Sequence, residues 1–329
     1  MGLTETLADY FDLNQHDTTV RTELLAGLTT FLTMSYIVVV NPAIIADAIL
    51  ADGGIGVGRG QLIGMLAVVT IISAATATLV MAFYADRPFA QAPGLGLNAF
   101  FAYTVVIGMG VPWETALAAV VVEGLVFIAL TAVGAREYVM GLLPEPVNLA
   151  VGSGIGLFLA LIGFESMRVV AGDAATFVTF SPVFAEDPVA LISVAGLLFT
   201  FALYARGIRG SIVVGILGTS VVGYAAAALG YTAYNPENVP GDASIATDIF
   251  LTGSTTTYSL AAYDIRPLAG AFLEGFGNVD AFTFALVVFT FFFVDFFDTA
   301  GTLVGVGQTA GFLDEDGNLP DIDKPLMAD

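Results

Sequence analysis

The chain alternates long apolar runs with short polar segments. An α-helix rises about 1.5 Å per residue, so a run of about 20 apolar residues crosses a hydrocarbon core of about 30 Å. The pattern therefore predicts an all-α polytopic membrane protein. The candidate spans are residues 23–41, 62–84, 97–110, 115–133, 147–166, 188–205, 211–231 and 282–304.

A proline and two polar stretches set the expected boundaries. The first span should end at Asn41, because a helix usually ends before a proline and Pro42 follows. Residues 232–281 form the longest segment between spans and are expected to be an external connector. Residues 307–329 are expected to form a polar tail.

The last candidate span carries two acids at membrane depth, Asp295 and Asp298. A charged side chain there costs about 2.5–3.5 kcal/mol on the insertion scale, so neither should face lipid. Their spacing places both on one side of a helix, close enough for their protons to be coupled. We predict a polar site lined by protein, with Thr299 in a supporting role. The simpler alternative is a structural carboxylate that accepts helix-terminal N–H bonds.

The stretch of residues 88–103 breaks regular helix with two prolines and two glycines. Such backbone is tolerated at membrane depth only where protein buries it or where it lines a cavity. Broken helices point free N–H groups and the positive end of a half-helix dipole at a polar ligand. Asn98 offers a donor and an acceptor, and Phe100 an apolar face for a flat ring. A kinked packing helix is the alternative.

Glu123 is the other deep acid, inside the fourth candidate span. Its sequence neighbours are apolar, so its carboxyl group must face protein rather than lipid. We expect a supporting or helix-tying role rather than direct contact with a ligand.

Composition supports the membrane assignment and removes several chemistries. The 329 residues are 57% hydrophobic and 12% charged, whereas a soluble domain carries about 25% charge. There is no cysteine, which excludes disulfides and thiolate metal sites. The one histidine, His16, precedes the first span and supports no metal site or proton relay. We expect no cofactor.

The formal charge of −21 describes the wetted surface, because most acids lie between the spans. It argues against binding to nucleic acid and against anchoring to anionic lipid. An acid-rich surface with little lysine is typical of halophilic adaptation.

The basic residues favour a cytoplasmic N-terminus, because positive charge gathers in cytoplasmic loops. With residues 1–20 inside, six basic residues are cytoplasmic and three external. The cytoplasmic set is Arg21, Arg87, Arg136, Arg206, Arg209 and Lys324, and the external set is Arg59, Arg168 and Arg266.

Several ordered blocks of the chain resemble the AzgA-like hypoxanthine/guanine/adenine permeases of the xanthine/uracil permease superfamily of nucleobase–cation symporters. The resemblance covers the chain from about residue 5 to its end. Its blocks are TVRTELLAGLTTFLTMSYIVVVNP (19–42), PFAQAPGLGLNAFFAYTVV (88–106), VPWETALAAVVVEG (111–124), GIGLFLALIG (154–163) and FFFVDFFDTAGTLVGV (291–306).

The resemblance implies a fold of two inverted seven-helix repeats, with a third span that is half strand and half helix. It implies a core of spans one to four (21–135) and eight (282–306), with a gate of spans five to seven (136–231). Transport would be a movement of core against gate.

The resemblance also implies a substrate site. Asn98 would contact a purine nucleobase, and Asp295 would hydrogen-bond the ring N–H groups. Ala99 and Phe100 complete this predicted site, while Asp298, Glu123 and Thr299 would support binding or proton coupling. The partners are then a purine, a proton and membrane lipid, and a homodimer stays open.

The chain departs from that family in length, because the family continues for another six spans after the eighth. A truncated fragment that does not transport is therefore the main alternative. An anion permease of the same fold is weaker, because no basic residue lies near the half-helix. An enzyme is not expected, because the chain has neither a nucleophile motif nor a phosphate loop, and no third carboxylate or histidine lies near Asp295 and Asp298 by spacing.

Overall fold

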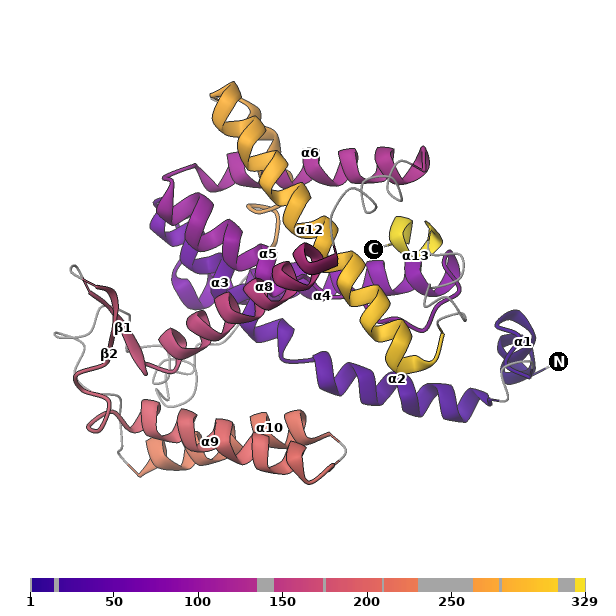
Figure 1. The fold of residues 1–329 in the computed structure, drawn as a ribbon, viewed down its shortest axis with the longest axis horizontal. Helices are drawn as coiled ribbons and strands as arrows, with labels where there is room; N and C mark the ends of the chain where they lie inside the picture. Colours follow the sequence, from indigo (N-terminus) through magenta and orange to yellow (C-terminus); the bar gives the residue numbers. More distant parts are fainter. Residues whose placement is uncertain are drawn as a thin grey trace. The chain divides into compact units, whose positions relative to one another are not determined.

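The computed structural model describes residues 2–14, 18–134, 145–173, 176–208, 210–229, 263–277, 280–312 and 323–328. Helices dominate these residues (Figure 1). By length and composition, five helical stretches of the described chain could cross a membrane: Val20–Ala51, Arg59–Phe83, Trp113–Ala132, Pro188–Ala205 and Ala281–Thr299. Shorter apolar helices occupy Leu95–Gly108, Gly156–Ser166 and Ser211–Ala226. The predicted helical, polytopic character is confirmed.

The chain divides into two compact units, which we describe separately. The first comprises Met1–Glu23, Met34–Leu157 and Ser259–Asp329, and the second comprises Leu24–Thr33 and Phe158–Tyr258. Helices α2 (Val20–Met34) and α8 (Glu145–Ser166) contribute residues to both units. The first unit otherwise contains α1 (Leu3–Tyr10), α3 (Ile37–Ala51), α4 (Arg59–Phe83), α5 (Leu95–Ala99), η1 (Phe100–Gly108), α6 (Trp113–Ala132), η4 (Ala271–Phe276), α12 (Ala281–Ala310) and α13 (Asp323–Ala328).

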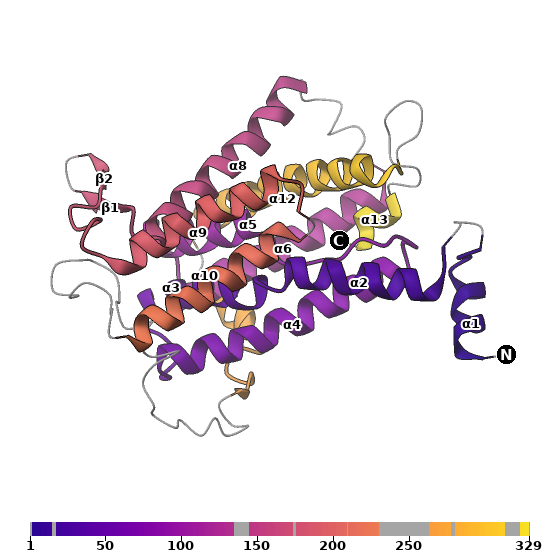
Figure 2. The ribbon, with the colours of Figure 1, turned by 90° about the horizontal axis from the view of Figure 1, so that it is seen from below.

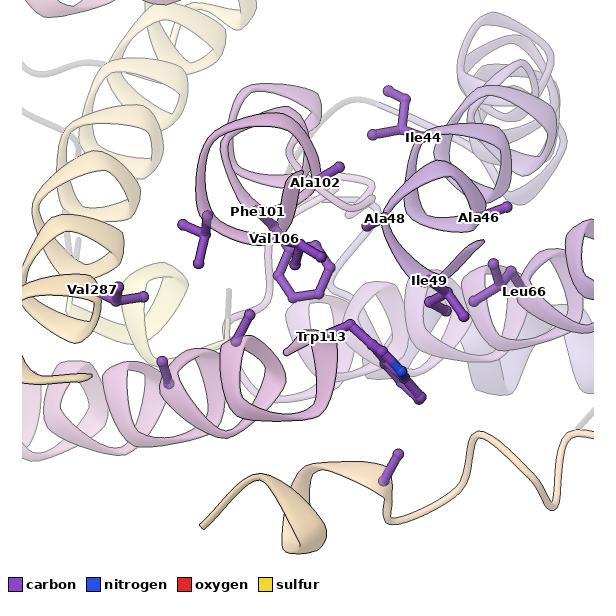
Figure 3. Packing of buried hydrophobic residues seen from close by; sticks show 14 of the residues in the cluster. Ile44, Ala46, Ala48, Ile49, Leu66, Phe101, Ala102, Val106, Trp113 and Val287 are labelled. Carbon is purple, nitrogen blue, oxygen red and sulfur yellow. The ribbon is translucent and has the colours of Figure 1, made fainter. Parts of the chain in front are cut away.

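The core of the first unit is an apolar cluster contributed by α3, α4, η1, α6 and α12 (Figure 3). Small side chains such as Ala48 and Ala102 let the helices approach, and Phe291 fills the space between them with no exposed surface. The start of α6 is fixed to the end of α3, because the Trp113 backbone N–H donates to Asp52 Oδ2 over 2.9 Å. These contacts hold α12 and the third span in one unit.

The expectation that the first span ends at Asn41 is wrong. Helix α2 ends at Met34, and α3 begins at Ile37 and continues through Pro42 to Ala51. A proline inside a helix removes one intrahelical hydrogen bond. Pro42 is fully buried and α3 packs along α4, so tertiary packing outweighs this local cost.

The third span is broken, as predicted, but its first half is not a strand. Residues 86–94 form neither helix nor strand, and no described strand pairs with them, whereas a strand requires a hydrogen-bonded partner. Gln91 anchors this segment to α4, since its N–H donates to Thr78 Oγ1 over 3.0 Å. The helical half begins with α5 and continues as the π-helix η1. π-Helical turns are rare and frequently occur at functional sites.

Two segments expected to be polar linkers are packed. Most of the predicted connector, residues 232–262, lies outside the described residues, but its end forms η4 against α6. The hydroxyl of Thr115 donates to the carbonyl of Gly275 over 3.1 Å. The predicted polar tail begins inside α12, and α13 buries Leu326 and Ala328 against the end of α4.

The second unit is organised around the helical hairpin of α9 (Pro188–Ala205) and α10 (Ser211–Ala228), which lie side by side (Figures 1 and 2). Two reciprocal close contacts join them, Gly196 against Thr219 and Gly215 against Thr200. Small residues commonly permit such close packing between membrane helices.

A short antiparallel hairpin of β1 (Val170–Asp173) and β2 (Phe177–Phe180) precedes α9, and the sequence did not predict it. Asp187 caps α9 by accepting from the Val189 N–H and also pairs with Arg168 over 3.0 Å.

Candidate substrate site

The extended segment of the third span meets α12 at Asp298. A methyl group placed on Gly94 would lie 3.1 Å from Asp298 Oδ2, so a side chain at Gly94 would force this carboxylate to shift by a few tenths of an ångström. Gly94 is the N-cap residue of α5, and its carbonyl accepts the Asn98 N–H over 3.1 Å. Asn98 and Asp298 therefore border the same helical turn.

Asn98 takes part in a buried chain of side-chain hydrogen bonds within the first unit. Its Nδ2 donates to Asn41 Oδ1, and Asn41 Nδ2 donates to Thr70 Oγ1 over 2.9 Å. Asn41 and Thr70 are only 8% and 3% exposed, whereas Asn98 is half-buried. This series of hydrogen bonds joins α3, α4 and α5, and Asn98 lies at its more accessible end.

Asp295 and Glu123 lie close together across the contact between α12 and α6, near enough for a hydrogen bond between their carboxyl groups. Glu123 is 3% exposed, and among the described residues its Oε1 has no hydrogen-bond partner. Ionised carboxylates accept but cannot donate, so this hydrogen bond requires a proton on one of the two groups. The sequence spacing predicted coupling between Asp295 and Asp298, but it could not indicate this partner on α6.

The remaining predicted site residues lie beside these groups. Ala99 is completely buried, and Thr299 is 7% exposed on α12 next to Asp298. The Phe100 ring contacts Phe291 edge-to-face with centroids 5.2 Å apart, so it packs against α12. Direct contact of Phe100 with a flat substrate stays a prediction.

Sequence reasoning missed Asn41 and Thr70 as parts of this arrangement. Asn41 precedes a proline and so indicates the end of a helix, but an amide inside an apolar span also needs a hydrogen-bonding partner. That requirement was the available signal. The partner's identity depends on how α3 and α4 pack, which the sequence does not show.

The arrangement offers hydrogen bonds rather than metal ligands. Among the described residues, no three His, Cys, Asp or Glu side chains form a group that could hold a metal ion. Asn98 and Asp298 can instead bind the polar edge of a small molecule at membrane depth. The Glu123–Asp295 pair can hold a proton nearby.

A groove of about 400 Å³ on the α9–α10 hairpin has a different character. Its lining is apolar apart from Thr219, whose hydroxyl donates to Gly215 of its own helix. It therefore provides little to bind a polar ligand.

Comparison with known proteins gives an independent assignment. The xanthine/uracil permease model, described as a permease family, matches residues 21–329. A relative from Methanocaldococcus jannaschii, which carries the name of a permease, is 38% identical over 97% of this chain and 65% of its own length. The guanine/hypoxanthine permease PbuG of Bacillus subtilis is 34% identical over 97% of this chain and 66% of its own. The adenine permease AdeP of Escherichia coli is 33% identical over 97% and 63%, respectively.

The chain thus spans less than two thirds of the length of these relatives. The match nevertheless extends over nearly the whole of this chain and includes the broken third span, α6 and α12. This multi-pass membrane protein belongs to the xanthine/uracil permease family, a family of transporters rather than enzymes.

Proposed function

We propose that the protein takes part in secondary active transport of purine nucleobases across the cell membrane, coupled to protons. The relatives named for adenine and for guanine/hypoxanthine support the substrate class. The observation that carries the proposal is the placement of Asp298 at Gly94, one helical turn from Asn98. A carboxylate and an amide beside broken backbone suit the N–H and C=O groups of a purine edge.

In this proposal Asp295 also binds the ring N–H groups, and Glu123 orients its carboxyl group. The hydrogen bond between Asp295 and Glu123 supports this role, because it holds one oxygen of the pair in place. The proton that this bond requires is the natural candidate for the coupled proton. Asp298 and Thr299 support the site from the same helix.

The proposed architecture is the inverted repeat of seven helices, with the N-terminus in the cytoplasm. The compact units support the division into core and gate in part, since one unit gathers α3 to α6 with α12 and the other contains α9 and α10, whereas α2 and α8 are divided between them. The transport movement would then displace these groups of helices against each other.

An anionic substrate fits the site poorly. Asp298 Oδ2 lies at the N-cap of α5, where its negative charge offsets the positive end of the helix dipole. An anion at this position would meet the carboxylate at close range. A neutral heterocycle with N–H donors avoids that repulsion.

The test measures binding by purified protein and uptake by cells that lack their own nucleobase transport. We expect hypoxanthine or adenine to raise the melting temperature of the chain. Gly94→Ala should weaken binding about tenfold, because the added methyl group shifts the Asp298 carboxylate and weakens its proposed hydrogen bond to the purine. The backbone φ of −67° at Gly94 accepts alanine, so the fold should be retained.

Gly60→Ala is the matched control, since Gly60 lies in the first turn of α4 and has no atom within 4 Å of the added carbon. It should bind nucleobases as the unchanged chain does. The proposal is wrong if no purine stabilises the unchanged chain, or if Gly94→Ala and Gly60→Ala bind purines equally well.

A further inference from the structure

We propose that Asn41 and Thr70 are positioning residues that fix which atom of the Asn98 amide faces the substrate. The inference rests on the proposed function and deepens it, because it concerns how the same site distinguishes one purine from another. Two chemical features carry it. The Thr70 hydroxyl has one proton to donate, and the side-chain amides of Asn41 and Asn98 each have a donor end and an acceptor end.

We call the hydrogen-bonded series Thr70–Asn41–Asn98 the relay. It starts at Thr70, whose Oγ1 lies 2.8 Å from the carbonyl oxygen of Leu66. A carbonyl oxygen only accepts hydrogen bonds, so the hydroxyl proton of Thr70 must point at it. Thr70 Oγ1 therefore has no proton left for Asn41, 2.9 Å away, and can only accept from it.

The direction of the Thr70 hydroxyl proton sets the orientation of the Asn41 side-chain amide. Its Nδ2 must face Thr70, because only the amide nitrogen carries donors. Its Oδ1 then faces Asn98 and accepts from Asn98 Nδ2. Asn41 and Thr70 are both buried, so water does not compete for these bonds. If the Asn41 amide were turned over, its Oδ1 would face Thr70 Oγ1 and its Nδ2 would face Asn98 Nδ2. Both contacts would be unfavourable.

The orientation passes on to Asn98. With Nδ2 committed to Asn41, the Oδ1 of Asn98 is the end left outside the relay. Among the described residues, Asn98 makes no further side-chain hydrogen bond, and it is only half-buried. The relay therefore presents to the substrate an amide oxygen at a fixed position, with the second Nδ2 proton beside it.

A fixed amide distinguishes purines that have the same shape. Hypoxanthine carries a donor at ring position 1 and an acceptor at position 6, whereas adenine carries an acceptor at position 1 and a donor at position 6. An amide held in one orientation pairs correctly with one of these patterns and leaves groups unpaired with the other. A buried unpaired polar group is costly enough to account for strong discrimination between close analogues.

Thr70→Val tests the relay, because valine keeps the shape of threonine but removes the hydroxyl group. The measured quantity is the ratio of the dissociation constants for adenine and hypoxanthine, obtained with purified protein. We expect the unchanged chain to prefer one base and Thr70→Val to reduce that preference about tenfold, since Asn41 and Asn98 can then adopt either orientation.

Two variants control for effects on structure. Thr70→Ser restores the hydroxyl group and should restore the preference. Thr76→Val makes the same change on the same helix, at a threonine that also donates to a carbonyl one turn back but is exposed and outside the relay. It should leave the ratio unchanged.

The outcomes separate this inference from the proposed function. If the unchanged chain binds neither base, the proposed function fails and the inference fails with it. If the unchanged chain binds purines but does not distinguish them, or if Thr70→Val weakens both bases equally, the proposed function stands. In either case the positioning role of Thr70 and Asn41 is refuted.

Discussion

At the scale of single residues, we propose that the Glu123–Asp295 pair holds the coupled proton. A hydrogen bond between two carboxyl groups exists only while one of them holds a proton. Both side chains belong to helices long and apolar enough to cross the membrane, and Glu123 is buried. Loss of the proton would leave two carboxylates in contact at low dielectric, which is strongly unfavourable.

Glu123→Gln should therefore separate binding from proton coupling. The glutamine amide donates permanently to Asp295, as a protonated Glu123 would. In the unchanged chain we expect purine binding to weaken as pH rises, because the pair loses its proton. In Glu123→Gln we expect binding to persist at alkaline pH, with an affinity within about tenfold of the unchanged chain at acidic pH. Dissociation constants measured across the pH range check this.

Glu114→Gln is the matched control, since Glu114 lies in the first turn of the same helix and away from the pair. It should retain the pH dependence of the unchanged chain. A pH profile that is the same for the unchanged chain and Glu123→Gln would remove Glu123 from the coupling mechanism.

The sequence indicated the important polar residues but not their partners. Asp295, Asp298, Glu123 and Asn98 were recognisable because each interrupts an apolar run. Helical spacing relates residues within one helix, and so it suggested that the two aspartates interact. The structure gives Asp295 a partner on α6 and places Asp298 beside Gly94, and both contacts depend on how separate helices pack.

At the scale of secondary-structure elements, the contact between η4 and α6 is the clearest feature that the sequence did not predict. Gly275 lies so close to the backbone of Glu114 that any added side-chain atom would overlap its carbonyl group. The Thr115 hydroxyl bond to Gly275 and the buried Ala271 complete the contact. Residues 263–277 are thus part of the first unit rather than a free connector.

Gly275→Ala should destabilise the protein, because rigid backbone cannot move aside as a flexible side chain could. We expect a loss of about 1–3 kcal/mol in the free energy of unfolding, the usual cost of overpacking. Thermal unfolding in detergent measures it. Gly124→Ala, in α6 with no atom within 4 Å of the added carbon, should have little effect. Equal stability of the two variants would show that η4 does not pack on α6 as described.

The positions of helices were more predictable from the sequence than their ends and irregular parts. The candidate spans recur as helices because apolar runs of this length suit a membrane. Pro42 lies inside α3 and the β1–β2 hairpin was missed, because burial and pairing with distant residues decide both. The first half of the third span forms neither helix nor strand, so its breaker residues predicted the break but not its form.

At the scale of the whole molecule, the proposed N-terminal orientation assigns each loop to one side of the membrane. The helical stretch Val20–Ala51 counts as one span, which places the loop after α3 outside. With α4, the third span, α6, α8 and α9 as the following spans, the turn between α9 and α10 lies inside. Arg206 in that turn agrees with the excess of positive charge expected in cytoplasmic loops.

The absence of cysteine makes this orientation directly testable, because any thiol labelling of this chain must come from the one introduced cysteine. Ala51→Cys, at the exposed end of α3, should react with a membrane-impermeant maleimide in intact cells. Ile208→Cys, which is 43% exposed in the turn after α9, should react only after the membrane is opened. Both variants should retain purine-dependent thermal stabilisation, because neither residue contacts the site. The reverse labelling pattern would place the N-terminus outside, and labelling of both thiols in intact cells would mean that the number of spans between them is even rather than odd.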